Sequence, residues 1–204
     1  MRLGAIVALV VACGKREPDA VPTATIDVAA INALVPAALR DELVFEQREL
    51  VTDHTGGGVA PKVTFTAAVP RGWERQPFAI VDDFAALVPP AASKLAGAAD
   101  LSLKSACKQD GICVAQDGVA WAALAEKEVF GPYRRDGIVI ERDDVRATDR
   151  LAILRRAADR YLVYAWWRDG GTRFRICAAR LASAAEAAAP AFEKACRTVV
   201  VTGE

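Results

Sequence analysis

The C-terminal third of the chain constrains the fold most, because short apolar segments follow one another there at the spacing of strands. Residues 138–145 and 151–154 have the composition of β-strands. Residues 161–168 form a third segment, and alternating apolar side chains at 172–177 form a fourth. Asp169-Gly170-Gly171 separates the last two, and this sequence favours a tight turn because its residues tolerate positive φ. The pattern predicts an antiparallel meander.

The segment 161–168 is almost wholly apolar and aromatic. A strand of this kind is typical of the middle of a sheet that is covered on both faces. Trp166 and Trp167 are adjacent in it, and adjacent strand residues point to opposite faces. We therefore expect one indole to pack under a helix, and the two cannot form a single platform by themselves.

The first part of the chain predicts a second pair of strands. Residues 42–51 and 63–67 alternate between apolar and polar side chains, and the glycine-rich stretch 54–58 lies between them. This stretch lacks the lysine and the following helix of a phosphate-binding loop, so it is interpreted as a connection. Residues 26–40 predict one short helix, or two helical turns broken at Pro36.

The middle of the chain predicts further short strands and a helix. The strands are at residues 78–81, 85–88 and 101–105. The helix is expected over 117–130, with Val119, Leu124 and Val129 near one face and Trp121 beside it.

The end of the chain predicts a helix that folds back over the sheet. Ser183 and Glu186 have the spacing of a capping box, in which each side chain satisfies an amide of the first turn. Pro190 either kinks this helix or marks its true first turn. Phe192 and Cys196 lie on one face at helical spacing. The segments together predict an α+β fold, in which helices pack on an antiparallel meander sheet.

The first apolar run has the pattern of an export signal. Arg2 supplies a positive start, residues 3–12 are apolar, and the small residue Ala12 precedes Cys13. The polar stretch 14–19 follows at once. This run resembles the lipobox of bacterial lipoproteins, which implies that Cys13 carries the lipid, with palmitate among the acyl chains. The alternatives are an N-terminal core strand or a membrane helix, but a spanning helix needs about 20 apolar residues.

This signal sets the expected organisation of the 204-residue chain. Residues 1–12 are the signal peptide, residues 13–25 are a flexible tether, and residues 26–204 are a single domain. The whole chain has 26 basic and 26 acidic side chains, and loss of Arg2 with the signal leaves a formal charge of −1. Such a balance gives no electrostatic footprint for nucleic acid, and we expect no cofactor.

Four cysteines remain once Cys13 is set aside, and an even number in an exported protein suggests two disulfide bonds. Four cysteines allow three connectivities. Local geometry favours Cys107–Cys113, which closes a tight loop, and Cys177–Cys196, which ties a strand to the final helix. A zinc or redox role is the alternative, but five and then eighteen residues separate these cysteines, unlike the short spacings of metal and redox pairs.

Few other residues carry a chemical signal. His54 is the only histidine and follows Asp53; we interpret it as a solvated loop residue rather than a general base. The pairs Asp82-Asp83 and Asp143-Asp144 lack the ligand spacing of an EF-hand, so turn and strand-edge positions are expected. The sequence predicts no catalytic constellation and no metal site. It therefore favours a binding protein over an enzyme.

A partner surface is the remaining candidate site. Arg173 and Arg175 share a strand face near Arg168 across the hairpin, and an arginine pair of this kind suits an anionic ligand. The alternative is a solvated or salt-bridged face. With Trp166 and Trp167, these arginines form the predicted partner surface.

Three motifs resemble the PsbP-like α/β/α sandwich, a fold of photosystem extrinsic proteins and of many bacterial lipoproteins. They are Val69-Pro70-Arg71-Gly72-Trp73, the run Tyr161 to Trp167, and Pro190-Ala191-Phe192. The resemblance covers residues 40–202. The chain also resembles alanine-rich lipoproteins of high-GC Gram-negative bacteria, in which paired cysteines bracket similar positions. The superfamily has no shared catalytic residues, so the resemblance transfers none.

The expected function is therefore a non-catalytic envelope lipoprotein, held to the membrane by Cys13, that binds a protein partner or ligand. Gly14 stands where enteric lipoproteins retained in the inner membrane have aspartate. This resemblance favours the outer membrane, with the domain in the periplasm. An envelope hydrolase and a small-ligand carrier are the alternatives; the first requires a polar pocket and the second an enclosed apolar cavity.

Overall fold

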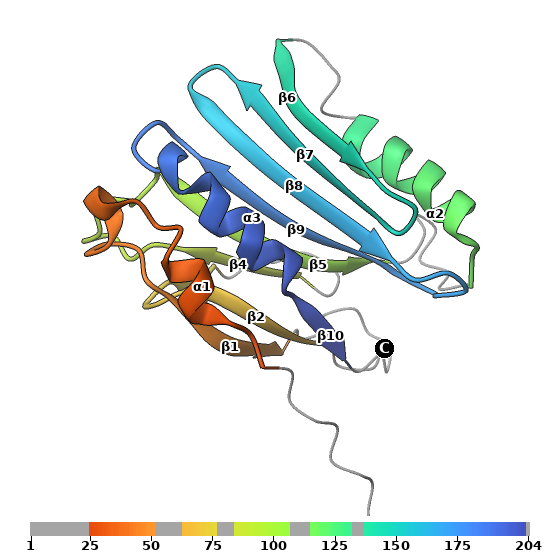
Figure 1. Ribbon diagram of the computed structural model, residues 1–204, viewed down its shortest axis with the longest axis horizontal. Helices are drawn as coiled ribbons and strands as arrows, with labels where there is room; N and C mark the ends of the chain where they lie inside the picture. The colour runs from red at the N-terminus through yellow and green to blue at the C-terminus, as the bar shows by residue number, and fades with distance from the viewer. Residues whose placement is uncertain (1–24, 52–62, 77–83, 107–114, 132–136, 203–204) are drawn as a thin grey trace, which may run out of the picture.

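The computed structural model describes residues 25–51, 63–76, 84–106, 115–131 and 137–202. Seven strands form an antiparallel sheet in the order β3-β4-β5-β9-β8-β7-β6 (Figure 1). Their bounds are β3 Glu74–Arg75, β4 Phe84–Val88, β5 Ala99–Ala106, β6 Ile138–Val145, β7 Asp149–Arg156, β8 Asp159–Trp167 and β9 Phe174–Leu181. The predicted C-terminal meander is thus β6 to β9, and β5 joins it by pairing with β9.

A second, three-stranded sheet has the order β1-β2-β10. Its bounds are β1 Phe45–Val51, β2 Thr64–Pro70 and β10 Val200–Thr202. The predicted hairpin is confirmed, because β1 pairs with β2 in antiparallel register. Its separation from the large sheet was not predicted. At the far end of the chain, Val201 pairs with Phe65 and so adds a third strand to this hairpin.

The helices are short, and Pro36 divides the first two as expected. Their bounds are α1 Val28–Asn32, η1 Ala37–Leu39, α2 Gly118–Ala125, η2 Glu126–Phe130, η4 Glu186–Ala188 and α3 Ala189–Arg197. In Figure 1, α3 crosses one face of the large sheet and α2 lies at the far side of β7 and β8. None of the helices in these described ranges has the length and apolar character to cross a membrane.

Two apolar cores flank the seven-stranded sheet. The larger lies between this sheet, α3 and the small sheet, and the smaller lies between the sheet and α2. In β8, Leu162 and Tyr164 enter the larger core, whereas Val163, Ala165 and Trp167 enter the smaller one. The prediction of a central strand covered on both faces is therefore confirmed, and the fold is α+β.

The predicted apolar face of the 117–130 helix is wrong at its start. Val119 is 80% exposed, and the side chains that α2 buries are Trp121 and Ala125. The next turn is a π-helix, which holds more residues per turn than an α-helix and so rotates the face that packs. Val129 and Phe130 are both buried as a result.

The predicted capping box is also wrong. Ser183 and Glu186 do not cap the helix; η4 begins after Ala185, whose side chain makes no capping hydrogen bond. Glu186 binds arginines of the sheet instead. Pro190 lies in the first turn of α3, where a missing N–H removes no helical hydrogen bond.

Candidate functional site

The β8–β9 hairpin is fixed to the start of α2 by hydrogen bonds. The Gly170 N–H donates to the Gln116 carbonyl at 2.9 Å, and the Gln116 N–H donates to the Gly171 carbonyl at 3.1 Å. Asp169 Oδ1 accepts from the Gly118 N–H at 2.8 Å. Gly170 has a φ of 69°, as the predicted tight turn requires. The hairpin therefore presents its neighbouring side chains from a defined position.

Trp166 and Trp167 lie on opposite faces, as predicted. Trp167 is buried against the α2 core, and its Nε1 donates to the Ala147 carbonyl at 3.1 Å. Trp166 lies on the α3 face and is half-buried at the border of the larger core. Its ring stacks on Tyr164 with centroids 5.2 Å apart and planes inclined by 17°. Only Trp166 is thus available to a partner surface.

Three arginines lie near the β8–β9 turn, and one of them, Arg175, is on the α3 face. Arg175 is paired in register with Trp166, so both side chains leave the sheet on one side. Burial lowers the pKa of the Arg175 guanidinium below its ordinary value, and the positive charges of Arg168 and Arg173 lower this pKa further. The predicted proximity of the three arginines is therefore present. Arg173 is itself buried, with 9% of its surface exposed, whereas Arg168 is exposed.

Tyr164 connects this group to α3, which the sequence did not predict. The Arg197 guanidinium lies over the Tyr164 ring, 5.1 Å from its centroid. Burial raises the pKa of the Tyr164 hydroxyl, the charge of Asp149 raises it further, and Arg197 opposes both. The shared face of Tyr164 and Trp166 follows from strand alternation, but the contact with a residue of the final helix does not.

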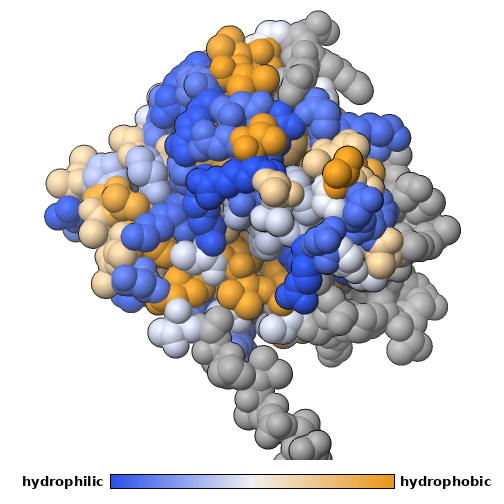
Figure 2. All heavy atoms as spheres, turned by 45° about the vertical axis from the view of Figure 1, so that its right-hand side comes forward, coloured by the Kyte–Doolittle hydropathy of each residue, from blue (hydrophilic) through white to orange (hydrophobic). Residues whose placement is uncertain are grey.

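We define the arginine–aromatic surface as Tyr164, Trp166, Arg168, Arg173 and Arg175. Arg168 is exposed, Trp166 and Arg175 are half-buried, and Tyr164 and Arg173 are buried. Figure 2 brings forward the right-hand side of Figure 1, on which the β8–β9 turn lies. Hydrophilic residues cover most of this side, and hydrophobic residues are scattered between them. The composition of this surface is that of binding sites, in which tryptophan, tyrosine and arginine are enriched.

A β-bulge distributes charges along β6. The register shifts between Ile140 and Arg142, so Glu141 and Arg142 both reach the α3 side of the sheet. Arg142 binds Glu193 of α3 at 2.9 Å and also pairs with Asp144. Arg142 thus binds two carboxylates, that of Asp144 on β6 itself and that of Glu193 on α3.

A closed ring of ion pairs lies beside the bulge. Arg155 contacts Glu141 and Glu186, both at 2.5 Å, and Arg160 contacts the same two carboxylates at 2.8 and 3.0 Å. Hydrogen bonds from Arg155 are the largest cause that lowers the pKa of each carboxyl group. The ring therefore joins the start of the α3 segment to β6, β7 and β8.

This ring predicts a pH-dependent part of the stability. A carboxyl pKa lowered in the folded state stabilises the protein above the unfolded pKa, and this contribution is lost as pH falls below about 4. We expect Glu141→Gln/Glu186→Gln to lower the Tm at pH 7 by about 2–4 °C, because the ring is partly exposed. Between neutral and acid pH, the Tm of the double variant should also fall less than the Tm of the wild type.

Thermal unfolding followed by circular dichroism at several pH values measures this difference. The matched control is Glu49→Gln, which removes an exposed carboxylate from β1 and should leave the Tm and its pH dependence unchanged. Equal loss of Tm in the wild type and the double variant on acidification would contradict the role given to the ring.

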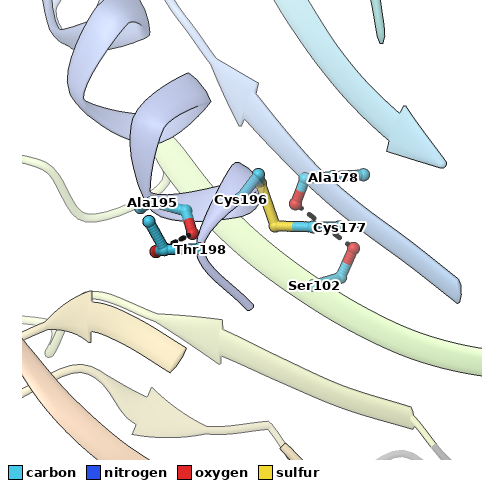
Figure 3. The surroundings of a disulfide bond; sticks show 6 residues. All are labelled: Ser102, Cys177, Ala178, Ala195, Cys196 and Thr198. Atoms are coloured by element: carbon cyan, nitrogen blue, oxygen red, sulfur yellow. Dashed lines mark hydrogen bonds between the residues drawn. A yellow bond between two sulfur atoms is a disulfide. The ribbon is translucent and has the colours of Figure 1, made fainter. Parts of the chain in front are cut away.

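A disulfide bond between Cys177 and Cys196 joins β9 to α3, as predicted (Figure 3). Its Cα atoms are 5.4 Å apart, and both residues are buried. Beside it, Ser102 Oγ of β5 donates to the Ala178 carbonyl at 3.4 Å, and Thr198 Oγ1 donates to the Ala195 carbonyl at 2.8 Å. Cys13, the Cys107–Cys113 pair, His54 and Asp82-Asp83 lie outside the described residues.

The acidic pair Asp143-Asp144 is divided between the two faces of β6. Asp143 accepts two hydrogen bonds from Arg150, at 2.8 and 2.7 Å, on the side of α2. Asp144 pairs with Arg142 on the side of α3. Across the described ranges, no group of at least three His, Cys, Asp or Glu side chains is placed to hold a metal ion.

A hollow of about 460 Å³ lies next to β4 and β5, away from the hairpin end. Small apolar residues and the charged side chains of Glu74, Asp100 and Arg180 line it. Arg180 donates to Asp100 at 2.8 Å and to the Gly97 carbonyl at 3.1 Å. The guanidinium therefore serves to connect β9, β5 and the preceding turn.

The fold is thus an α+β sandwich around a seven-stranded antiparallel sheet, with an arginine–aromatic surface at one end. No family model matches the chain, and no curated protein matches it. Among solved structures, the Ran-binding protein Mog1p of Saccharomyces cerevisiae is similar with a TM-score of 0.48 and 11% identity, over 76% of this chain and 95% of that one. A point mutant of Mog1 gives a TM-score of 0.48 and 12% identity over the same shares. Both likenesses are too distant to bear on the partners of this chain.

Proposed function

We propose that the chain is a non-catalytic lipoprotein of the bacterial envelope that binds a protein partner through the arginine–aromatic surface. The observation that carries this proposal is the placement of Trp166 and Arg175 on one face of a hairpin that α2 holds in place, with the exposed Arg168 two residues after Trp166. Rigid presentation reduces the entropy lost on binding, so such a surface can contribute strongly to affinity.

The disulfide bond supports an envelope location. Cys177–Cys196 is formed between two core residues, and disulfide bonds persist in oxidising compartments such as the bacterial periplasm. The signal pattern before Cys13 supports a lipid anchor there, and Gly14 supports the outer membrane. Attachment by the several acyl chains of a bacterial lipoprotein exceeds the two signals that stable anchoring needs.

The PsbP-like α/β/α sandwich is proposed for the finer class of fold. Supporting it, α3 covers one face of the seven-stranded sheet and α2 the other, and the three-stranded sheet extends the layer that contains α3. The family resemblance brings no catalytic residue, and the fold alone does not establish an activity.

The anchor is tested by metabolic labelling with palmitate and by fractionation of the expressing cells. We expect label and membrane association in the wild type, and the loss of both in Cys13→Ala. Cys107→Ala/Cys113→Ala is the matched control, since it also removes cysteines but leaves the lipobox. Label that persists in Cys13→Ala would contradict the proposed anchor.

The binding surface is tested in the same cells by a photocrosslinking amino acid placed at Arg168, with Arg156 as the control position. Both residues are exposed, but Arg156 is the last residue of β7 and pairs with Asp159 at the start of β8, the end of β8 opposite to Arg168. A discrete crosslinked product from position 168 alone is expected. Crosslinks from both positions, or from neither, would contradict a binding site at the hairpin.

A further inference from the structure

The hollow beside β4 and β5 lies at the end of β9 that is away from the β8–β9 turn. Its volume of about 460 Å³ is within the range of pockets that bind small ligands. Glu74 of β3 is paired with Val88 of β4, and Asp100 of β5 is paired with Arg180 of β9. Residues paired in register point to the same face of a sheet, so four neighbouring strands supply side chains to one hollow.

The guanidinium of Arg180 already has its partners within the protein. It donates to Asp100 Oδ2 at 2.8 Å and to the Gly97 carbonyl at 3.1 Å, and it lies 3.5 Å from Asp159 Oδ2. Two carboxylates therefore face one guanidinium, and the net charge of this group is negative. Arg180 fixes one wall of the hollow and leaves negative charge for a ligand to balance.

The hollow also has acceptors that are not used. Glu74 is exposed, and among the described residues it has no hydrogen-bond or ion-pair partner. Asp100 binds Arg180 through Oδ2, so its Oδ1 also lacks a hydrogen-bond partner among these residues. The exposed amide of Gln76, two residues after Glu74, lines the same hollow. The described lining thus offers three hydrogen-bond acceptors, and its one cation is paired.

The remaining wall of the hollow is apolar, and its side chains are small or rigid. Val88 ends β4, Pro89 follows it, and Ala91 and Ala96 are exposed in the connection to β5. A short alkyl chain that lies against these side chains is removed from water, which favours binding. The hollow therefore combines an anionic part with a short apolar part.

We infer that this hollow binds a primary ammonium group on a short aliphatic chain, with the ammonium at Glu74 and Asp100 and the chain against Val88 and Pro89. An ammonium group has three N–H donors and no acceptor, which matches the three acceptors. An anionic ligand is disfavoured, because the two carboxylates repel it. The site lies away from the arginine–aromatic surface and is independent of the proposed function. Its ligand is either a free amine or the lysine side chain of another protein, which share this chemistry.

The test uses the purified full-length chain in detergent solution, with pentylamine as the probe. The amide signals of Gly97 and Ala99, which line the hollow, are followed by NMR during the titration. We expect saturable shifts of these signals with a dissociation constant of about 1–10 mM, because the ligand is small and the site is open. Added salt should weaken the binding. Pentanol, which has the same chain without the charge, should bind less tightly.

Three variants locate the binding. Glu74→Gln removes the unpaired carboxylate and should weaken pentylamine binding about two- to fivefold, the range for an exposed ion pair. Glu49→Gln removes an exposed carboxylate of β1, in the other sheet, and should leave binding unchanged. Ala96→Leu keeps every charge but fills part of the hollow, so it should weaken binding by a similar factor. All three positions are exposed, so the fold should tolerate these changes.

The same titration with N-acetyl-lysine methylamide distinguishes the two sources of the ammonium group. Binding that depends on Glu74 and is tighter than that of pentylamine supports a lysine side chain of a partner, and weaker binding supports a free amine. Equal weakening by Glu74→Gln and Glu49→Gln would overturn the inference, because it shows attraction to charge alone. Binding that Ala96→Leu leaves unchanged would overturn it too, since the hollow would not hold the chain, and so would the lack of a saturable shift with either probe.

Discussion

Replacement of Phe192 by alanine is expected to lower the free energy of unfolding by about 3–5 kcal/mol, the range for truncation of a buried phenylalanine. Phe192 is fully buried. Its ring lies 5.2 Å from that of Phe45 in β1 and 5.9 Å from that of Trp73 after β2. The substitution leaves a cavity where α3 meets the small sheet, and surrounding side chains relax only partly into such a space.

Chemical unfolding followed by circular dichroism measures this effect. Phe192→Leu keeps part of the volume and should cost much less, whereas Val119→Ala on the exposed side of α2 should change stability by less than about 0.5 kcal/mol. A loss below about 1 kcal/mol for Phe192→Ala would show that α3 does not depend on this contact.

The second large effect is expected from Cys177→Ala/Cys196→Ala. The disulfide closes a loop with a sequence separation of 19 residues. In the chain-entropy model, a bond across such a loop restricts the unfolded chain and stabilises the fold by about 3 kcal/mol. The double substitution avoids a buried unpaired thiol, so the loss of the cross-link dominates the result.

Unfolding in urea, with and without a reductant, separates the cross-link from other effects of the substitution. Both proteins are compared in a Cys107→Ala/Cys113→Ala background, so that Cys177–Cys196 is the bond that the reductant breaks. The protein that keeps Cys177 and Cys196 should lose about as much stability in reductant as the variant loses without it, and the variant should be insensitive to reductant. A variant as stable as the oxidised wild type would refute a stabilising role for the bond.

Much of the fold could be predicted because it depends on local patterns. Strand alternation located β6 to β9, and glycine in a turn located the β8–β9 hairpin. The continuous apolar run identified β8 as central because each of its faces meets a different core. These features need only the neighbours of each residue in the sequence.

The errors arose where distant residues decide the structure. The π-helix after α2 changed which side chains of this segment are buried. The formation of a π-helical turn depends on packing, and the pattern of apolar and polar residues does not reveal it. Glu186 was expected to cap a helix, but Arg155 and Arg160 of the sheet bind it. The strand β10 belongs to a sheet whose other strands lie far earlier in the chain.

The same distinction applies to the candidate site. The opposite orientations of Trp166 and Trp167 follow from the geometry of one strand. The stacking of Arg197 on Tyr164 required the path of the final helix across the sheet. The alternation of side chains along one strand cannot predict such a contact, because the contact depends on how the helix packs on the sheet.

The bulge in β6 has a consequence for how copies of the protein meet. β6 is the last strand of the large sheet and exposes Val139, Ile140 and Val145, so a regular strand there would offer a template for another chain. At Ile140/Arg142 the backbone departs from regular register, and charged side chains stand beside the irregularity. An incoming strand could not continue the hydrogen-bond ladder past this point. The bulge therefore protects this edge against strand-by-strand association with another copy.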